Sequence, residues 1–133
     1  MADPAEKEIR AVIDEMTGAL NEGDATKLDS LLSDRPGAIH LGTDPRERWT
    51  KQQLLTSITQ AMSVGGSLVR AEHDEFHVDV DGDVAWTEGT GRFLNEKGAQ
   101  RAFRMTGVLV REGGRWKVAQ AHASIGVPNE EMF

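Results

Sequence analysis

The sequence predicts an α+β domain in which three N-terminal helices pack on a long, curved antiparallel sheet, and three observations support that prediction. Apolar residues recur every three or four positions in the first half of the chain, which is the spacing of one helical face. From Ser67 onward they recur at every second position, as in strands with one buried face. Turn sequences at residues 81–82, 95–98 and 112–114 divide this second half into four strands.

Each predicted helix has a recognisable start. The sequence Asp-Pro-Ala-Glu at residues 3–6 has the form of a capping box with a first-turn proline, and Gly23 is a typical C-terminal stop. Asp24 can cap a second, shorter helix, which must end before Pro36. The capping box from Thr50 to Gln53 begins the third helix.

The remaining elements follow from turns and glycines. The third helix is expected to end at Gly65-Gly66, a short strand is expected at residues 38–41, and the tail after Pro128 is expected to be loosely ordered. The long strands are expected at residues 68–80, 83–94, 100–111 and 115–125. The sequence contains no linker or internal repeat, so we expect a single domain over residues 1–133.

The net charge of −7 and the lack of cysteine exclude several classes of function. Lysine and arginine are scattered, so the sequence lacks the basic surface that binds nucleic acid or anionic membranes. Disulfides, thiolate metal sites and cysteine nucleophiles are excluded. The N-terminus does not resemble an export signal, and no segment approaches the ~20 apolar residues of a membrane span. We expect a soluble, cytoplasmic protein with no nucleic-acid or membrane partner.

Polar side chains gather on one face of the last two predicted strands. By strand alternation the set is Arg104, Thr106, Gln120, His122 and Ser124, and the turn at Gly113 makes them cross-strand neighbours. Such a cluster can bind a carboxylate or a phosphate-like group through Arg104, with His122 as acid or base.

The same face has a second interpretation, as the interface of a homodimer, and we favour it slightly. Four apolar residues are expected on this face as well: Trp116, Val118, Val108 and Val110. Left uncovered, they would form an apolar patch larger than monomers usually tolerate. A one-residue bulge would reverse this assignment of faces.

The opposite face of these strands is apolar. Its members are Phe103, Met105, Leu109, Ala119, Ala121 and Ala123, with Gly107 opening space between them. This mixture of small and large groups can line a cavity, although packing against the first helix is the commoner explanation. Large side chains, including Trp86, also alternate with glycines on neighbouring strands, which predicts volume that the helices do not fill.

Carboxylates at two places are candidate catalytic bases. If Trp86 packs inward, Glu88 lies beside an indole in a low dielectric, which suits acid or base catalysis; a solvated strand glutamate is the commoner alternative. His40, Asp44 and Trp49 are expected together at one end of the sheet. Asp44 before proline more often completes a turn, and Trp49 before the helix cap is more often a lid or a hydrophobic staple.

Metal and cofactor sites are not predicted. His73, Glu75 and His77 are close in sequence, but strand alternation turns them outward and they lack the arrangement of a known ligand motif. Gly89-Thr90-Gly91 lies in the middle of a strand, where glycines permit a bend rather than cradle a phosphate.

The order of elements and three sequence segments are similar to one known superfamily. The segments are Leu41-Gly42-Thr43-Asp44-Pro45 followed by Trp49, Arg104-Met105-Thr106-Gly107-Val108-Leu109, and Gly114-Arg115-Trp116-Lys117-Val118 leading into Gln120, His122, Ser124 and Gly126. Over nearly its whole length the chain resembles the SnoaL-like branch of the ketosteroid-isomerase-like, or nuclear-transport-factor-two-like, superfamily.

The resemblance implies a cystatin-like cone, open at one end as an apolar pocket and commonly dimeric through the outer face of the sheet. It does not imply one activity, because members of the superfamily include isomerases, cyclases, dehydratases and hub domains. Ketosteroid isomerases hold an enolate oxygen with a tyrosine hydroxyl, and this chain has no tyrosine. Steroid isomerisation is therefore not expected.

Two functions are compatible with the sequence. The first is a domain that binds a small, mostly apolar molecule bearing one polar or anionic group, in a pocket with His40, Trp49, Trp86, Phe103 and Met105 among its walls. The second is a cofactor-independent lyase, isomerase or hydrolase. It would use Glu88 or Asp44 as the base and His122 or Arg104 to stabilise negative charge.

Overall fold

The computed structural model describes residues 3–65 and 69–133. Within these ranges the chain forms three α-helices, a six-stranded sheet and a short 3-10 helix, which confirms the α+β prediction. The helices are α1 (Pro4–Glu22), α2 (Ala25–Leu31) and α3 (Lys51–Ser63), and the 3-10 helix is η1 (Asn129–Glu131). The strands are β1 (Ile39–Leu41), β2 (Arg48–Trp49), β3 (Val69–Asp81), β4 (Val84–Asn95), β5 (Gln100–Glu112) and β6 (Arg115–Ser124).

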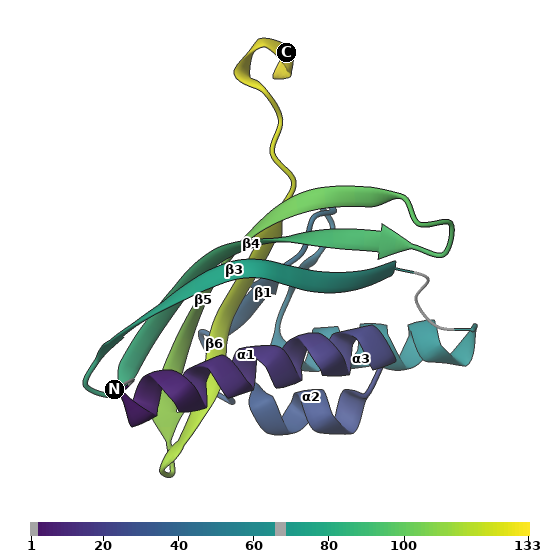
Figure 1. Cartoon of the computed structure of the whole chain (residues 1–133). Coiled ribbons are helices and arrows are strands. Elements are labelled where there is room, and N and C mark those ends of the chain that lie inside the picture. Colours follow the sequence, from purple (N-terminus) through teal and green to yellow (C-terminus); the bar gives the residue numbers. More distant parts are fainter. Residues whose placement is uncertain (1–2, 66–68) are drawn as a thin grey trace.

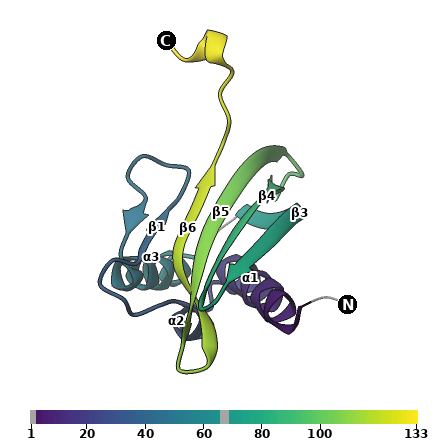
Figure 2. The same ribbon diagram turned by 90° about the vertical axis from the view of Figure 1, so that its left-hand side faces the viewer.

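The sheet arches over the helices, all of which lie on its concave side (Figure 1). Its order is β2-β1-β6-β5-β4-β3, and the four long strands pair antiparallel through their connecting turns. The sequence did not predict β2, nor that β1 would pair with β6 in parallel. The view from the side shows β1 and α3 near one edge of the sheet and α1 under the other (Figure 2).

The helix ends are fixed by local hydrogen bonds. The Thr50 hydroxyl accepts from the Gln53 N–H and the Gln53 side chain accepts from the Thr50 N–H, which is the predicted capping box. Gly23 ends α1 at φ 67°, a conformation that favours glycine. Asp3 caps α1, but Glu6 pairs with Arg10 instead of completing a box. The predicted helix end at Gly66 and strand start at Leu68 lie outside the described residues.

The main core lies between the helices and the concave face of the sheet. Helix α1 buries one side, including Ile9 and Ile13, against the sheet, where Leu109 and Val118 are fully buried. Trp116 is only 3% exposed and belongs to this core. Removing this apolar surface from water is the main force that holds α1 on the sheet.

A β-bulge in β6 corrects the predicted assignment of faces. Val108 pairs with Gln120 while the next residue, Leu109, pairs with Val118, so Ala119 is an extra residue between them. Because side chains alternate, the bulge puts Val118 on the concave face although Gln120 lies on the convex one. Trp116 and Val118 are therefore core residues, and they do not share a face with Gln120, His122 and Ser124 as the sequence had predicted.

A second bulge changes the face of a histidine. In β3, His73 pairs with Gly91 and Glu75 pairs with Thr90, so Asp74 is the extra residue. His73 therefore faces the concave side, together with Phe76 beyond the bulge, whereas His77 is exposed on the convex side. The prediction that His73 and His77 share the outward face is wrong for this reason.

The space beside two glycines of the concave face is occupied by neighbouring atoms and is not empty volume. A Cβ at Gly91 would lie 2.4 Å from the Phe103 ring and 2.4 Å from the Glu72 carbonyl oxygen. At Gly107 an added Cβ would lie 2.9 Å from the Thr87 hydroxyl oxygen. The expectation that these glycines leave cavity volume is therefore corrected: they allow close contact between β3, β4 and β5.

The chain beyond β6 leaves the sheet and projects away from it (Figure 1). This tail was expected to be loosely ordered, and it contains the short helix η1. Its last residue, Phe133, is fully exposed. Among the described residues, no helix is both long enough and apolar enough to cross a membrane.

We predict opposite effects for one chemical change at two glycines. Gly91→Ala should lower the free energy of unfolding by about 1–3 kcal/mol, because the new methyl group overlaps a backbone oxygen and the Phe103 ring. Gly18→Ala, inside α1 where an added methyl group would meet no atom within 4 Å, should raise it by about 0.5–1 kcal/mol. Chemical denaturation measures both, and equal effects at the two sites would contradict the packing described for Gly91.

Candidate functional site

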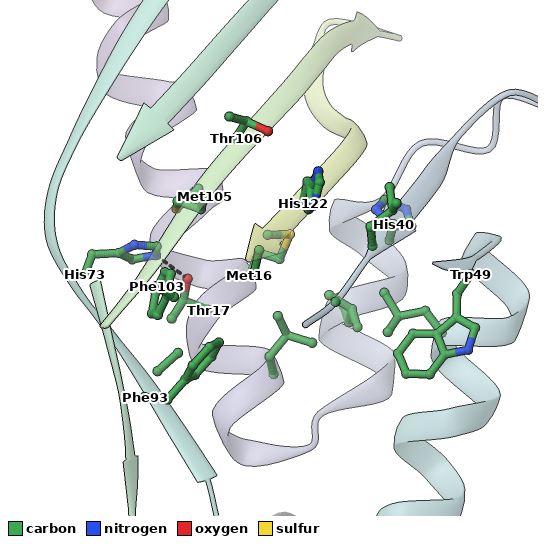
Figure 3. A pocket seen from close by; sticks show the side chains of 18 residues that line it. Met16, Thr17, His40, Trp49, His73, Phe93, Phe103, Met105, Thr106 and His122 are labelled. Carbon is green, nitrogen blue, oxygen red and sulfur yellow. Dashed lines mark hydrogen bonds between the residues drawn. The ribbon is translucent and has the colours of Figure 1, made fainter. Parts of the chain in front are cut away.

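A cavity of about 200 Å³ opens between α1 and the concave face of the sheet. Its walls come from the three helices, the β1–β2 region and the four long strands, and Figure 3 shows them from close by. Nearly all of the lining is hydrocarbon, and its larger apolar side chains are Met16, Leu20, Leu28, Leu41, Trp49, Leu54, Phe93, Phe103 and Met105. The cavity is somewhat larger than the roughly 150 Å³ that suffices to hold a benzene molecule in an apolar protein interior.

Aromatic contacts fix the wall on the β3–β5 side. The ring centroids of Phe93 and Phe103 are 4.5 Å apart, and the Phe103 centroid is 6.2 Å from that of His73. His73 also packs 5.3 Å from Phe76, whose ring lies under the Arg10 guanidinium. This side of the cavity is therefore a preformed surface rather than a set of free side chains.

His40 is a buried polar group in the opposite part of the wall. It lies in β1, paired with Trp49 of β2 and Ala121 of β6, and it is only 4% exposed. Neither ring nitrogen has a hydrogen-bond partner among the residues that the structure describes. A neutral imidazole carries one donor and one acceptor, so both functions of this ring are unused. Leaving buried polar groups unpaired costs about 1–3 kcal/mol each.

His73 is held by Thr17 of α1. The Thr17 hydroxyl oxygen lies 2.6 Å from the His73 Nε2 and 3.0 Å from the carbonyl oxygen of Ile13. A hydroxyl has one hydrogen, and the Ile13 carbonyl can only accept. Both contacts are hydrogen bonds at the same time only when Thr17 donates to Ile13 and the Nε2–H of His73 donates to Thr17; in the other ring tautomer Thr17 would donate to Nε2 and the bond to Ile13 would be lost. The other ring nitrogen, Nδ1, is buried and has no partner within the described chain.

Both histidines are held in the neutral form. Burial lowers the pKa of His40 below its ordinary value of 6.5. Burial also lowers the pKa of His73, against the opposing effect of the carboxylates of Asp14 and Asp74. The described lining contains no Asp, Glu, Lys or Arg, so nothing in the wall carries a permanent charge.

The structure brings together some of the residues that the sequence singled out. His40, Trp49, Phe103 and Met105 line the cavity. Thr106 and His122 also border it, and they are cross-strand partners as expected. Their side chains, however, alternate with Met105 and Ala121 and are exposed on the convex face.

Other predicted site residues lie outside the cavity. Trp86 is 46% exposed on the convex face, since it alternates with the buried Ala85 and Thr87. Glu88 lies on the same face, where its Oε1 is 3.9 Å from the Nε2 of His77. Trp86 does not pack inward, so the condition for a catalytic Glu88 is not met, and Glu88 is instead the solvated strand glutamate of the alternative.

The remaining predicted residues are also on the outside. Arg104 pairs in register with Ser124, and Gln120 with Val108, which confirms that they are cross-strand neighbours, but on the convex face. Asp44 lies in the β1–β2 loop, where its carboxylate accepts two hydrogen bonds from the Arg46 side chain at 2.9 and 2.8 Å. These hydrogen bonds hold the pKa of Asp44 well below its usual range. This is the behaviour of a turn residue.

Sequence reasoning missed His73 and Thr17 as wall residues. A signal for His73 was present: the buried apolar positions of β3 fall at Ala71 and then at Phe76 and Val78, so the two-residue period breaks between them. No local signal marks Thr17, which lies on the buried side of α1 among apolar residues. In the described part of the chain, no group of three or more His, Asp or Glu side chains could hold a metal ion.

The chain matches one family of known proteins over most of its length. The family model for the SnoaL-like domain covers residues 9–128. This chain belongs to the SnoaL-like domain family. No curated protein matches it in sequence.

Solved structures share the fold of this SnoaL-like domain at low sequence identity. An NTF2-like protein of unknown function from Pseudomonas putida is 20% identical with a TM-score of 0.83, over 100% of this chain and 94% of that one. A provisionally named dehydratase of the NTF2-like family from Streptomyces avermitilis is 19% identical with a TM-score of 0.78, over 93% and 97% of the two chains. A cystatin-like protein of unknown function from Nostoc punctiforme is 12% identical with a TM-score of 0.77, over 98% of each. At these identities the likeness shows the fold alone.

We predict that acidification destabilises this SnoaL-like domain through His40 and His73. Their pKa values are lowered in the folded state, so the unfolded chain binds more protons as the pH falls below about 6.5. The stability that the folded protein has with both histidines neutral is therefore complete above that pH, and it is lost progressively as the pH falls below it. Chemical denaturation between about pH 7.5 and pH 5 should show a larger loss for wild type than for His40→Phe or His73→Phe.

The matched control for this prediction is Phe93→Leu, which alters the same wall without removing a titratable group. It should keep the pH dependence of the wild type even if it is less stable overall. Parallel pH curves for wild type and both histidine variants would contradict the prediction.

Proposed function

We propose that this SnoaL-like domain binds a small, mostly apolar organic molecule in the cavity between α1 and the sheet. The observation that carries the proposal is His40, a buried imidazole in an apolar wall whose nitrogens have no partner among the described residues. Ligand sites typically combine an apolar lining with a few buried polar groups that fix orientation. The cavity wall has that composition, with His40 and His73 as its polar groups.

An enzyme that uses a carboxylate of the pocket has less support. The two candidate bases, Glu88 and Asp44, lie on the convex face and in the β1–β2 loop, and the described lining contains no other carboxylate. A general base must come within hydrogen-bond reach of the proton that it removes. We therefore propose binding as the function and leave carboxylate catalysis aside.

Ligand binding is tested by filling the cavity. Ala121 of β6 lines it beside His40, with which it is paired in register, so Ala121→Phe should occupy the space that a ligand needs. In a thermal-shift screen of naphthalene-sized aromatics, monoterpenes and small carboxylates, followed by calorimetry, we expect wild type to bind at least one compound. The variant should bind that compound at least about 10-fold more weakly.

The control for this experiment is Glu88→Gln, which changes a charge on the convex face and should leave the affinity unchanged. Circular dichroism establishes that both variants are folded. If no compound binds to wild type, or if Ala121→Phe binds as well as wild type, the cavity is not the binding site.

We also propose that the domain forms a homodimer through the convex face of the sheet. Trp86 and Val84 are 46% and 43% exposed there, and Trp86 is paired in register with Val108. The same face carries Arg104 and Glu88, whose opposite charges allow a self-complementary contact across a two-fold axis. A second copy of this chain is the partner that these features fit.

Sedimentation at micromolar concentration should therefore show a dimer for wild type. Trp86→Glu should shift it to a monomer, because a carboxylate would be buried without a partner in the apolar centre of the interface. Val64→Glu, at an 84% exposed position at the end of α3, should remain a dimer. A wild-type monomer across the whole concentration range would contradict the proposal.

A further inference from the structure

We propose that the cavity selects an uncharged, mainly apolar molecule of one or two rings with a hydroxyl group, and that His73 accepts the hydrogen bond from this hydroxyl. The inference rests on the proposed binding function and adds the chemical class of the ligand. It follows from the hydrogen-bonding capacity that the wall leaves unused, from the charges that the wall lacks, and from the size of the cavity.

The unused capacity of His73 is an acceptor. We assign the ring tautomer that makes both Thr17 contacts hydrogen bonds, in which its Nε2–H donates to the Thr17 hydroxyl and the hydrogen of that hydroxyl is directed to the Ile13 carbonyl. In the neutral ring the remaining nitrogen, Nδ1, then carries no hydrogen, and its lone pair can accept a hydrogen bond. This atom is buried and has no partner in the described part of the chain, so a ligand that satisfies it must bring a donor. A ketone, an ether or a carboxylate cannot do so.

His40 adds a second, more permissive contact. It lies in β1, and β6, β5 and β4 separate it in the sheet from β3, which carries His73. The two imidazoles therefore come from different parts of the curved wall, as Figure 3 shows. His40 has one donor and one acceptor unpaired, so it can pair with either a donor or an acceptor atom of the ligand. The selectivity for a donor thus comes from His73.

The lack of fixed positive charge argues against an anionic ligand. Arginine and lysine are absent from the described lining, and Arg104, the cation expected to bind a carboxylate, is exposed on the convex face. The histidines are neutral, and the carboxylates of Asp14 and Asp74 near His73 would repel an anion. Burial of a charge without a partner in such an environment is strongly unfavourable.

The volume sets the size of the ligand. At about 200 Å³ the cavity exceeds what benzene requires and is too small for most molecules of several fused rings. We therefore choose 2-naphthol as the probe. Naphthalene lacks its hydroxyl, 2-methoxynaphthalene keeps the oxygen but removes the donor, and 2-naphthoate replaces the hydroxyl with a charge.

The experiment titrates the full chain with each of the four probes at neutral pH and follows amide signals by NMR. In wild type, 2-naphthol should bind about 3- to 10-fold more tightly than naphthalene or 2-methoxynaphthalene, which corresponds to one added hydrogen bond. The carboxylate 2-naphthoate should bind most weakly. In His73→Phe the preference for 2-naphthol should fall to about 1-fold while naphthalene still binds.

The matched control is Phe93→Leu, which changes an apolar part of the wall and should keep the preference for 2-naphthol. A second measurement does not depend on any variant: 2-naphthol, but not naphthalene, should shift the Nδ1 resonance of His73 in ¹⁵N spectra of the wild-type rings. It therefore tests the inference even if His73→Phe fails to fold.

The outcomes separate the two proposals. If 2-naphthol and naphthalene bind equally, or if 2-naphthoate binds most tightly, the inferred ligand class is wrong while binding in the cavity stands. The same holds if Phe93→Leu removes the preference or if the Nδ1 resonance does not move. If none of the four probes binds while a compound of the thermal-shift screen does, this inference is wrong and the proposed function stands; if nothing binds in either experiment, both are overturned.

Discussion

The cavity depends on the alternation of side chains along a strand, because one extra residue decides which side chains face the helices. In β3 the extra residue is Asp74, so that His73 before it and Phe76 after it both face inward. In β6 it is Ala119, with the buried Val118 before it and Ala121 in the cavity wall after it. Without the bulge at Asp74, His73 and Phe76 would lie on opposite faces, and the wall would lose its hydrogen bond to α1.

Most of the fold could be predicted because its signals are local. Caps such as Thr50 with Gln53, and the glycine turns between the long strands, fix element ends through neighbouring residues alone. The parallel pairing of β1 with β6 could not be predicted, since it joins residues that are about eighty positions apart in the chain and carries no turn sequence. The bulge in β3 did leave a trace in the sequence, a break in the two-residue period between Ala71 and Phe76. The prediction missed it because it assumed strict alternation along the whole strand.

The candidate site was predictable only where the faces were assigned correctly. Phe103 and Met105 lie in the uninterrupted part of β5, so simple alternation places them in the wall. Trp86 was included in the predicted wall, but the alternation of β4 buries Ala85 and Thr87 instead. An aromatic side chain does not by itself decide which face of a strand is buried, since a large part of any protein surface is apolar.

The chemistry of the wall, rather than the fold, limits what this SnoaL-like domain can do. Its described ionisable groups that face the cavity are imidazoles, and burial lowers the pKa of both His40 and His73. A neutral imidazole can donate or accept a hydrogen bond but does not supply the fixed charge of a carboxylate or a guanidinium. The sheet instead places Glu88 and Arg104 on its exposed face. A proton transfer carried out by the wall itself would therefore use a histidine, and the described lining offers no lysine or arginine to stabilise a negatively charged intermediate.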